Sequence, residues 1–164
     1  MKINKEGLDL IKHFESLHDG DLKTIGLQPK MDPIGIWTEG YGRAMRDSKG
    51  NFIKGSVNKD LAYKNISIHN EQEATNALTV DLTPREHVVA QNIKVSINEN
   101  QFSALVSYVY NTGGSNTLYK LINSNASEKD IRNWFETKYI TADGVPLKGL
   151  VLRRKAEADL YFKK

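Results

Sequence analysis

Apolar residues recur at helical spacing near the start of the chain and predict a first helix over about residues 5–17. Leu8, Ile11 and Phe14 fall on one face of this helix, and Glu15 lies on the same face, between Leu8 and Ile11. A carboxyl group held against apolar side chains is disfavoured in its charged form, so Glu15 could keep a proton near neutral pH and donate it. The alternative is an acid at the helix edge that reaches solvent or pairs with a base.

The helical spacing is lost between residues 18 and 55, where glycine and proline separate short runs of β-forming residues. This pattern predicts a small antiparallel sheet with strands at 22–27, 36–41 and 51–54. The sequence Ser-Lys-Gly-Asn at 48–51 predicts a hairpin turn.

Helical spacing returns at about residue 58 and continues to the end of the chain. A capping box predicts a helix over about 70–82. Thr83 suits an N-cap and Pro84 a first helical position, so a new helix is predicted to start there.

The segment from Asn98 to Gly113 is apolar on nearly all sides, which is typical of the buried centre of a helical bundle. Asn98 and Gln101 form a second capping box, and Gly113 can end the helix. The remaining predicted elements are short helices at 116–122 and 127–138, a turn at 143–146 and a last helix at 148–162.

Arg154 lies on the apolar face of the last helix and is predicted to be buried, where a guanidinium requires an anionic or carbonyl partner. A structural ion pair is favoured over pairing with Glu15. Six Lys and Arg against two acids give residues 145–164 an excess of positive charge. The excess suits binding to an anionic polymer such as cell-wall material or nucleic acid, but a solvated helix face explains it more simply.

Length and composition fit one globular domain, since 164 residues are 39% hydrophobic and 26% charged. The absence of cysteine excludes disulfides, cysteine nucleophiles and cysteine-ligated metals. No signal peptide and no apolar stretch approaching about 18 residues is readable, so we expect synthesis in the cytoplasm and no stable membrane association. A substrate outside the cytoplasm would then require a separate membrane-permeabilising factor to release the protein.

The stretch from Asp32 to Arg43, DPIGIWTEGYGR, combines a carboxylate, the Thr38 hydroxyl and two closely spaced glycines in a turn-and-strand pattern. Backbone can approach a ligand closely at such glycines. Together with Glu15 the stretch supplies two carboxyl groups in different environments, which push their pKa values apart and favour site chemistry.

Glu15 on a first helix followed by Asp32-x5-Thr38 resembles the catalytic segment of the phage-type lysozymes, endolysins that cleave bacterial peptidoglycan. Residues 100–113 look like the buried central helix of that family, and residues 149–159 look like its closing helix. The similarity therefore extends over nearly the whole chain.

The resemblance implies an α+β, mostly helical, lysozyme-like fold in a single domain of residues 1–164. A sheet-bearing lobe of about 18–65 and a helical lobe of about 84–164 would be joined by the first helix and by the helix at 70–82. The cleft would lie between the lobes.

By the same resemblance, Glu15 is the general acid, and Asp32 with Thr38 positions and activates the attacking water. The family inverts the anomeric centre, and its substrate is the β-1,4 bond between N-acetylmuramic acid and N-acetylglucosamine. No metal and no cofactor is implied. The partner is peptidoglycan, and we expect a monomer in the host cytoplasm before lysis and in the periplasm or cell wall afterwards.

The family lines its cleft from the end of the central helix, which places Tyr110 and Asn111 against the sugar. Tyr110 offers an apolar face to a pyranose ring, and Asn111 both donates and accepts hydrogen bonds, as an N-acetyl group requires. Gly40, Tyr41 and Gly42 would form the opposing wall. The alternative roles are a core position for Tyr110 and a helix C-cap for Asn111.

The sequence departs from the family in two places. Glu15 and Asp32 are further apart than usual, so residues 18–31 contain an insertion, and Asp19 and Asp21 compete for the role of second carboxylate. Arg43 stands where the family commonly has histidine. It could still pair with an acid of the following helix, or lie exposed at the end of a strand.

Two other kinds of protein that attack or bind peptidoglycan are alternatives. A zinc-dependent amidase would use some of His13, His18, His69 and His87, but their separations match no compact ligand pattern. A non-catalytic wall-binding module would explain the basic end and leave the acid on an apolar face unexplained. Nucleic-acid binding is disfavoured, because the basic residues surround one terminal helix without an aromatic-studded sheet.

Overall fold

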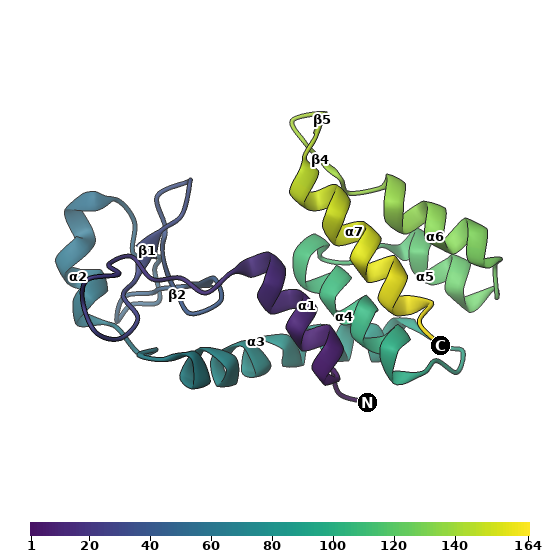
Figure 1. Cartoon of the computed structure of the whole chain (residues 1–164), viewed down its shortest axis with the longest axis horizontal. Helices are drawn as coiled ribbons and strands as arrows, with labels where there is room; N and C mark the ends of the chain where they lie inside the picture. The colour runs from purple at the N-terminus through teal and green to yellow at the C-terminus, as the bar shows by residue number, and fades with distance from the viewer. The chain divides into compact units, whose positions relative to one another are not determined.

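The computed structural model describes residues 1–164, which divide into two compact units. Unit 1 comprises Met1–Phe14 and Leu82–Lys164, and unit 2 comprises Glu15–Asp81. The chain is mostly helical with small antiparallel sheets (Figure 1), so the predicted α+β class is confirmed. None of its helices is long and apolar enough to cross a membrane.

Unit 2 is built on a three-stranded antiparallel sheet in the order β1-β2-β3. The strands are β1 (Lys30–Met31), β2 (Trp37–Glu39) and β3 (Arg43–Ala44). Its small core is formed by Trp37, Met45, Ile53 and Ala62, with Tyr63 packed against them. The central strand β2 is buried along its whole length, which fixes the side chains of the predicted site segment.

The predicted strand at 22–27 is wrong. This segment forms turns, in which Leu22 and Ile25 are 88% and 101% exposed. Asp21 accepts hydrogen bonds from the Lys23 N–H and the Thr24 hydroxyl, and such local bonds compete with strand pairing. The predicted strand at 51–54 is reduced to isolated bridges at Phe52 and Lys54.

The predicted hairpin turn before Phe52 is confirmed. The Gly50 N–H donates to the Asp47 carbonyl at 3.0 Å, and the Asp47 N–H donates to the Asn51 carbonyl at 2.8 Å. Gly50 has a φ of 83°, which glycine adopts without strain.

The sheet is followed by a 3₁₀ turn, η1 (Ser56–Asn58), and a short helix, α2 (Lys59–Lys64). The long helix α3 (Glu71–Asn92) comes next and contributes residues to both units. The helix break predicted at Thr83-Pro84 is wrong, because α3 continues through Pro84. A proline inside a helix costs about 3 kcal/mol.

Three inward-facing residues of α3 explain why the helix tolerates this proline. Leu78, Leu82 and Val89 are at most 3% exposed. Full burial of each side chain is worth about 1.5–3 kcal/mol, so together they outweigh the local penalty.

Unit 1 contains a bundle of helices and one hairpin. Its elements are α1 (Lys5–Glu15), α4 (Glu99–Thr112), α5 (Asn116–Asn123), α6 (Glu128–Thr137), β4 (Thr141–Ala142), β5 (Val145–Pro146) and α7 (Lys148–Tyr161). The last residue of α1, Glu15, is counted with unit 2. These elements match the predicted helices and turn within about two residues, and α1 ends two residues earlier than predicted. Helix α7 packs along α4 and α6 (Figure 1).

Helix α4 is the centre of unit 1. The Asn98–Gln101 capping box is present, and Gly113 closes the helix in the left-handed conformation at a φ of 83°. Residues Phe102 to Val109 are all buried, so the predicted buried central helix is confirmed.

The two chain ends lie in unit 1 and contact each other. Lys163 Nζ donates to Glu6 Oε2 at 2.6 Å near the C-terminus. Helix α1 also packs closely on α4, since a methyl group added at Gly7 would lie 2.5 Å from Ser103 Cβ.

Candidate active site

Glu15 is the last residue of α1 and is half-buried. It follows the buried residues Gly7 and Ile11 at four-residue spacing, so it continues their helix face as predicted. The next residue, Ser16, has a φ of 63°, and the chain turns sharply there. The carboxyl group is therefore held at a helix end by packing of the preceding turns.

Gly42 lies beside the Glu15 carboxyl group. A methyl group added at Gly42 would lie 3.6 Å from Glu15 Oε2 and 3.9 Å from His18 Cε1. Gly42 has a φ of 91°, which a side chain rarely permits. The structure thus brings together two of the predicted site residues that are far apart in sequence.

Gly40 and Tyr41 approach this region mainly through their backbone. The His18 N–H donates to the Gly40 carbonyl at 2.8 Å, and Gly40 has a φ of 59°. The Tyr41 side chain is buried, and its hydroxyl donates to Glu71 Oε1 at 3.2 Å. Any contact of Tyr41 with a sugar would therefore use its backbone.

Asp32 closes the turn that leads into β2. Its Oδ1 accepts the N–H groups of Ile34 at 3.0 Å and Ile36 at 2.8 Å. The Asp32 N–H in turn donates to the Ile36 carbonyl at 2.8 Å. These bonds fix the carboxylate through one oxygen and leave Oδ2 without a protein partner.

Thr38 lies in the middle of the sheet, opposite Lys30 on β1 and Ala44 on β3. Its hydroxyl donates to the Lys30 carbonyl at 2.8 Å, and the side chain is 5% exposed. Because the hydroxyl proton is engaged, Thr38 can bind a water only by accepting a hydrogen bond from it.

Glu39 is a buried acid in the predicted site segment that the sequence pattern does not single out. It accepts hydrogen bonds from the Ser67 N–H at 3.0 Å, the Ile68 N–H at 3.2 Å and the Ser67 hydroxyl. Its hydrogen-bonding capacity is met by a neighbouring loop, which indicates a structural role.

Arg43 forms a bidentate ion pair with Asp81 of α3. Arg43 Nε donates to Oδ2 and Nη2 to Oδ1, both at 2.9 Å, and Nη2 also donates to the Ala77 carbonyl at 3.0 Å. The prediction that Arg43 pairs with an acid of the following helix is confirmed. The pair anchors the end of β3 directly after Gly42.

The competing acids Asp19 and Asp21 also hold turns. Asp19 Oδ1 accepts the N–H groups of Asp21 and Gln28, each at 3.2 Å. Hydrogen bonds from the Thr24 hydroxyl and the Lys23 N–H lower the pKa of Asp21. Turn-forming contacts are thus common to both acids and to Asp32, and they do not distinguish one from another.

Tyr110 and Asn111 lie at the end of α4 in unit 1. Tyr110 is half-buried, and the guanidinium carbon of Arg85 lies 5.6 Å from its ring centroid. Asn111 is exposed, and its Oδ1 accepts a hydrogen bond from Arg154 Nη2 at 2.9 Å. Asn111 lines a cavity of about 310 Å³ with Thr112, Tyr139, Thr141 and Leu150.

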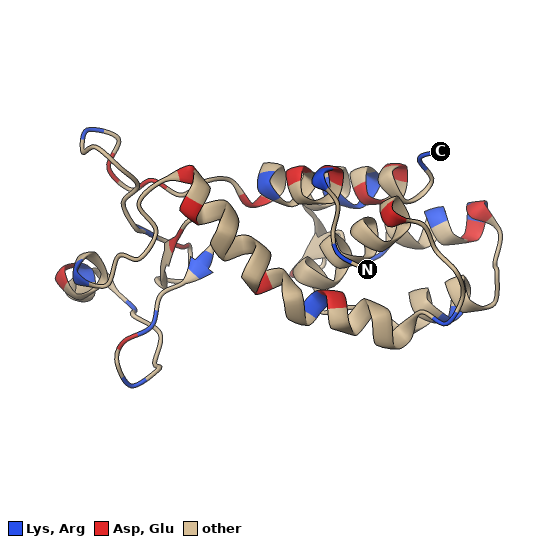
Figure 2. Ribbon diagram, turned by 90° about the horizontal axis from the view of Figure 1, so that it is seen from below, with Lys and Arg blue, Asp and Glu red and all other residues tan.

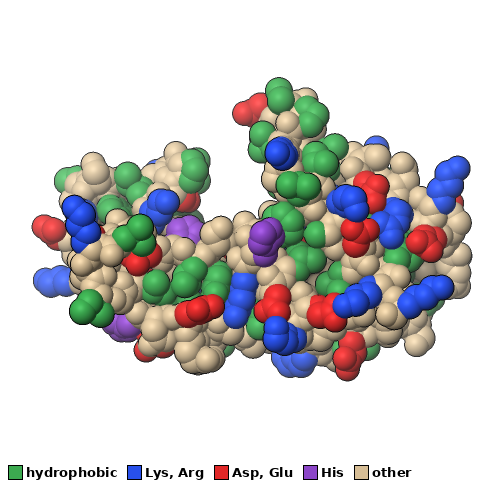
Figure 3. Space-filling model, viewed as in Figure 1, with side chains coloured by type: hydrophobic (Ala, Val, Ile, Leu, Met, Phe, Trp, Pro, Cys, Tyr) green, Lys and Arg blue, Asp and Glu red, His purple; other side chains and the backbone are tan.

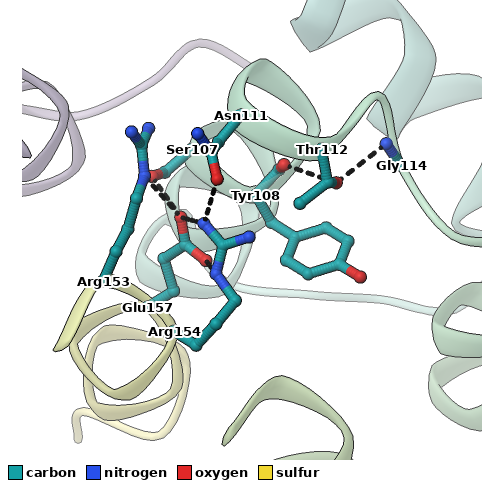
Figure 4. Close-up of polar contacts among 8 residues, drawn as sticks. All are labelled: Ser107, Tyr108, Asn111, Thr112, Gly114, Arg153, Arg154 and Glu157. Atoms are coloured by element: carbon teal, nitrogen blue, oxygen red, sulfur yellow. Dashed lines mark hydrogen bonds and ion pairs between the residues drawn. The ribbon is translucent and has the colours of Figure 1, made fainter. Parts of the chain in front are cut away.

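Arg154 is fully buried, as predicted, and its ionic partner is Glu157 on the same helix (Figure 4). Arg154 Nε lies 2.8 Å from Glu157 Oε2, so the favoured structural pairing is confirmed. Burial lowers the pKa of Arg154 and raises the pKa of Glu157, while the attraction between the two charges opposes both shifts.

Glu157 and Arg153 are buried charged residues that the sequence analysis missed. Ser107 Oγ donates to Glu157 Oε1 at 2.7 Å, and Arg153 Nε donates to the same oxygen at 3.3 Å. The sequence signal was the i,i+3 and i,i+4 spacing of both arginines from Glu157.

The excess of positive charge at the C-terminal end is mostly engaged within unit 1. Arg153 and Arg154 are buried, Lys155 pairs with Asp159 at 2.8 Å, and Lys163 pairs with Glu6. Figures 2 and 3 show charges of both signs interspersed on the surface of this unit. Since two of these cations are buried and two more pair with acids, the surface at this end of the chain is less basic than its composition suggests.

The histidines do not form a metal-binding set. No group of three or more His, Cys, Asp or Glu side chains is placed to hold a metal ion. His69 Nδ1 instead lies 3.0 Å from Glu73 Oε2. The residues present therefore do not fit the zinc site that an amidase would need.

Comparison with known proteins finds phage lytic enzymes. The family model described as phage lysozyme matches residues 21–157. An endolysin of Acyrthosiphon pisum secondary endosymbiont phage 1 is 27% identical over 168 residues, covering 98% of this chain and 98% of the relative. The family match includes Asp32 and Thr38 and begins after Glu15.

Solved structures give the same result for the fold. The endolysin from Escherichia coli O157:H7 phage FAHEc1 has a TM-score of 0.71 at 27% identity, covering 99% of this chain and 94% of that chain. A variant of P22 lysozyme has a TM-score of 0.73 at 20% identity, covering 98% of each chain.

Proposed function

Because the chain belongs to the phage lysozyme family and is a muramidase that hydrolyses peptidoglycan, we propose that Glu15, Asp32 and Thr38 are its catalytic residues. The bond cut is the β-1,4 linkage between N-acetylmuramic acid and N-acetylglucosamine. Glu15 protonates the leaving oxygen, and Asp32 with Thr38 positions the attacking water.

The placement of Glu15 beside Gly42 carries this proposal. Gly42 has no side chain and a positive φ, so its backbone lies beside the Glu15 carboxyl group without a side chain of its own between a sugar and that group. Packing of α1 holds the acid at the end of a rigid element, which limits the motion of the proton donor.

Asp32 and Thr38 each keep hydrogen-bonding capacity that a water could use. Asp32 Oδ2 has no protein partner and can accept one proton of a water, while Thr38 Oγ1 can accept the other. Acting as a base, Asp32 would take the proton as the water attacks the anomeric carbon.

Tyr110 and Asn111 are proposed to bind the sugar on unit 1, and Gly40, Tyr41 and Gly42 to contact it on unit 2. The half-buried Tyr110 ring offers an apolar surface, and Asn111 supplies hydrogen bonding beside a cavity. The glycine segment would act through its backbone.

The replacement Glu15→Gln tests the proposal. It keeps the shape of the side chain and removes the proton donor, so turnover of peptidoglycan should fall by about 10²–10⁴-fold while binding is retained. Glu6→Gln makes the same change on the same helix and should leave turnover intact. Full turnover by the Glu15→Gln variant, or loss of binding in step with turnover, would contradict the assignment.

Mass spectrometry of digested peptidoglycan should show new reducing-end N-acetylmuramic acid. Cut peptide stems would favour an amidase instead. Proton NMR of the first product should show the α-anomer, as inversion requires, and the β-anomer would contradict inversion.

We further propose that the enzyme acts as a monomer and accumulates in the host cytoplasm until another factor permeabilises the membrane. Expression in a susceptible host should then cause lysis only after the membrane is permeabilised. Lysis by the enzyme alone would contradict the need for such a factor.

A further inference from the structure

His18 links the turn after Glu15 to the glycine segment of residues 40–42. The His18 N–H donates to the Gly40 carbonyl at 2.8 Å, and His18 Nδ1 lies 3.1 Å from the same oxygen. Nδ1 also lies 3.2 Å from the Ser16 carbonyl oxygen. Both oxygens can only accept hydrogen bonds, so Nδ1 must carry a proton and donate it to them. The imidazole ring therefore bridges a carbonyl directly after α1 and a carbonyl directly after β2.

The two bridged residues have backbone conformations that require support. Ser16 has a φ of 63°, and a residue with a side chain keeps such a conformation only where surrounding contacts hold it. Gly40 is closely packed, since a methyl group added there would lie 2.9 Å from Ile68 Cδ1 and 3.4 Å from Ala74 Cβ. Gly40 is thus a firm anchor, and the His18 ring ties the turn at Ser16 to it.

The Glu15 carboxyl group lies next to this bridge. A methyl group added at Gly42 would lie 3.6 Å from Glu15 Oε2 and 3.9 Å from His18 Cε1, so the acid and the ring face the same small region. Glu15 is the last residue of α1 and directly precedes Ser16. A change in the turn would therefore move the carboxyl group relative to Gly42, and a displacement of about 1 Å is enough to slow a catalytic group strongly.

We propose that His18 is a positioning residue for the general acid, because its Nδ1–H bridge holds the turn after Glu15 against the glycine segment. The inference rests on the proposed role of Glu15 as the proton donor. The Nε2 atom of the ring takes no part in the bridge. Since Nδ1 carries a proton in the neutral ring with this tautomer and in the charged ring alike, the bridge does not depend on the charge of His18.

Two replacements separate the roles of the two ring nitrogens. His18→Asn places an amide NH₂ group where Nδ1 lies, so the side chain can still donate to both carbonyls. His18→Gln places its amide near the position of Nε2 and breaks the bridge, and His18→Ala removes both nitrogens.

We expect kcat on soluble peptidoglycan fragments to fall about 10- to 100-fold in His18→Ala and His18→Gln, as for a misplaced catalytic group. KM should stay within about twofold, because the bridge supports a group that acts in the transition state. His18→Asn should keep kcat within about threefold of the unmodified enzyme, since the bridge is retained.

The pH profile of kcat distinguishes positioning from proton transfer by the ring. The asparagine side chain does not titrate, so His18→Asn should show the profile of the unmodified enzyme if the ring acts only through its Nδ1–H. Loss of a limb of the profile at about pH 5–8, where histidine side chains titrate, would show that the ring moves protons and would overturn the inference.

His87→Ala is the matched control, because His87 is exposed on α3 and loses the same side chain. It should leave kcat unchanged. The midpoint of thermal unfolding should fall by less than about 4 °C in each His18 variant, since the Gly40 carbonyl keeps the backbone N–H and the carbonyl of exposed Ser16 can bind water. The comparison of His18→Asn with His18→Gln stands whatever the stability of His18→Ala.

Unchanged kcat in His18→Ala, or equal losses of kcat in the Asn and Gln variants, would overturn the inference. Full turnover by Glu15→Gln would overturn the proposed function instead. The two failures are therefore distinguishable.

Discussion

In this lysozyme the turn acids of unit 2 and the buried acid Glu157 of unit 1 are stabilised in different ways. In unit 2, Asp32 and Asp47 each accept two backbone N–H groups from residues at most four positions away. In unit 1, Glu157 is fully buried, and its partner Ser107 is 50 positions away in sequence. Local turns hold Asp32 and Asp47, whereas tertiary packing and two arginines of its own helix hold Glu157.

The difference determines what a mutation removes. Loss of a turn acid exposes a few N–H groups that water can satisfy, so the effect stays local. Loss of the Glu157 carboxylate leaves two arginines buried beside each other without their shared anion. The stability of unit 1 should therefore depend strongly on one side chain.

Glu157→Ala tests this dependence and has the largest expected effect. Removal of one partner from a buried ion pair costs about 3–5 kcal/mol, so the free energy of unfolding in urea should fall by that amount. Glu128→Ala is the control, because Glu128 is 64% exposed and lies 3.7 Å from Arg132. It should cost less than about 1 kcal/mol. Equal losses in the two variants would remove the contrast between buried and surface acids.

Arg43→Ala tests whether unit 2 contains a non-local ion pair of comparable weight. The Arg43–Asp81 pair is about one-third exposed on each side, so its loss should cost only about 1 kcal/mol in urea unfolding. Arg43→Lys should recover part of this, because it keeps the charge and loses the bidentate geometry. A loss as large as that of Glu157→Ala would show that both units depend on long-range pairs.

Asp159→Asn has the smallest expected effect and tests the surface of unit 1. Hydrogen bonds from Lys155 and Arg132 lower the pKa of Asp159, with Lys155 contributing most. A carboxyl group whose folded pKa is depressed stabilises the protein above its unfolded pKa and loses this effect as pH falls through the folded pKa. The variant should lose less than about 1 kcal/mol at neutral pH.

This difference between Asp159→Asn and the unmodified enzyme should begin to shrink in urea unfolding as pH falls below about 3.9, the usual aspartate pKa, and should disappear only below the depressed folded pKa. Asp143→Asn is the control, since Asp143 lies in the β4–β5 turn and forms no ion pair. It removes the same charge without breaking an ion pair. A difference for Asp159→Asn that persists in acid would point to packing instead of charge.

The helices of unit 1 could be predicted because their signals are local. Asn98, Gln101 and Gly113 mark both ends of α4, and α6 lies within the range predicted for it. Pro84 misled the prediction, since the burial that keeps α3 continuous depends on residues distant in sequence. The strand predicted at 22–27 was wrong for a local reason, because hydrogen bonds to Asp21 form turns in a segment with a strand-like composition.

For the candidate site, too, the sequence could group neighbouring residues but could not predict their long-range contacts. The carboxylate, hydroxyl and glycines at 32–42 lie in one short stretch, so the sequence could group them. The spatial approach of Gly42 to Glu15 and the contact of Arg154 with Asn111 arise from tertiary structure. Glu157 was missed because its spacing from the two arginines fits an exposed helical ion pair as well as a buried one.

Unit 1 is discontinuous in the chain, and this sets an order of events during synthesis. Helix α1 leaves the ribosome before unit 2, and the helices that receive it emerge only after all of unit 2. Unit 2 is contiguous and can fold as soon as it is complete, whereas α1 must wait for α4 and α7. The contact of Lys163 with Glu6 shows that the ends are close enough to be joined. A circular permutant that moves α1 behind α7 would make unit 1 continuous and remove that delay.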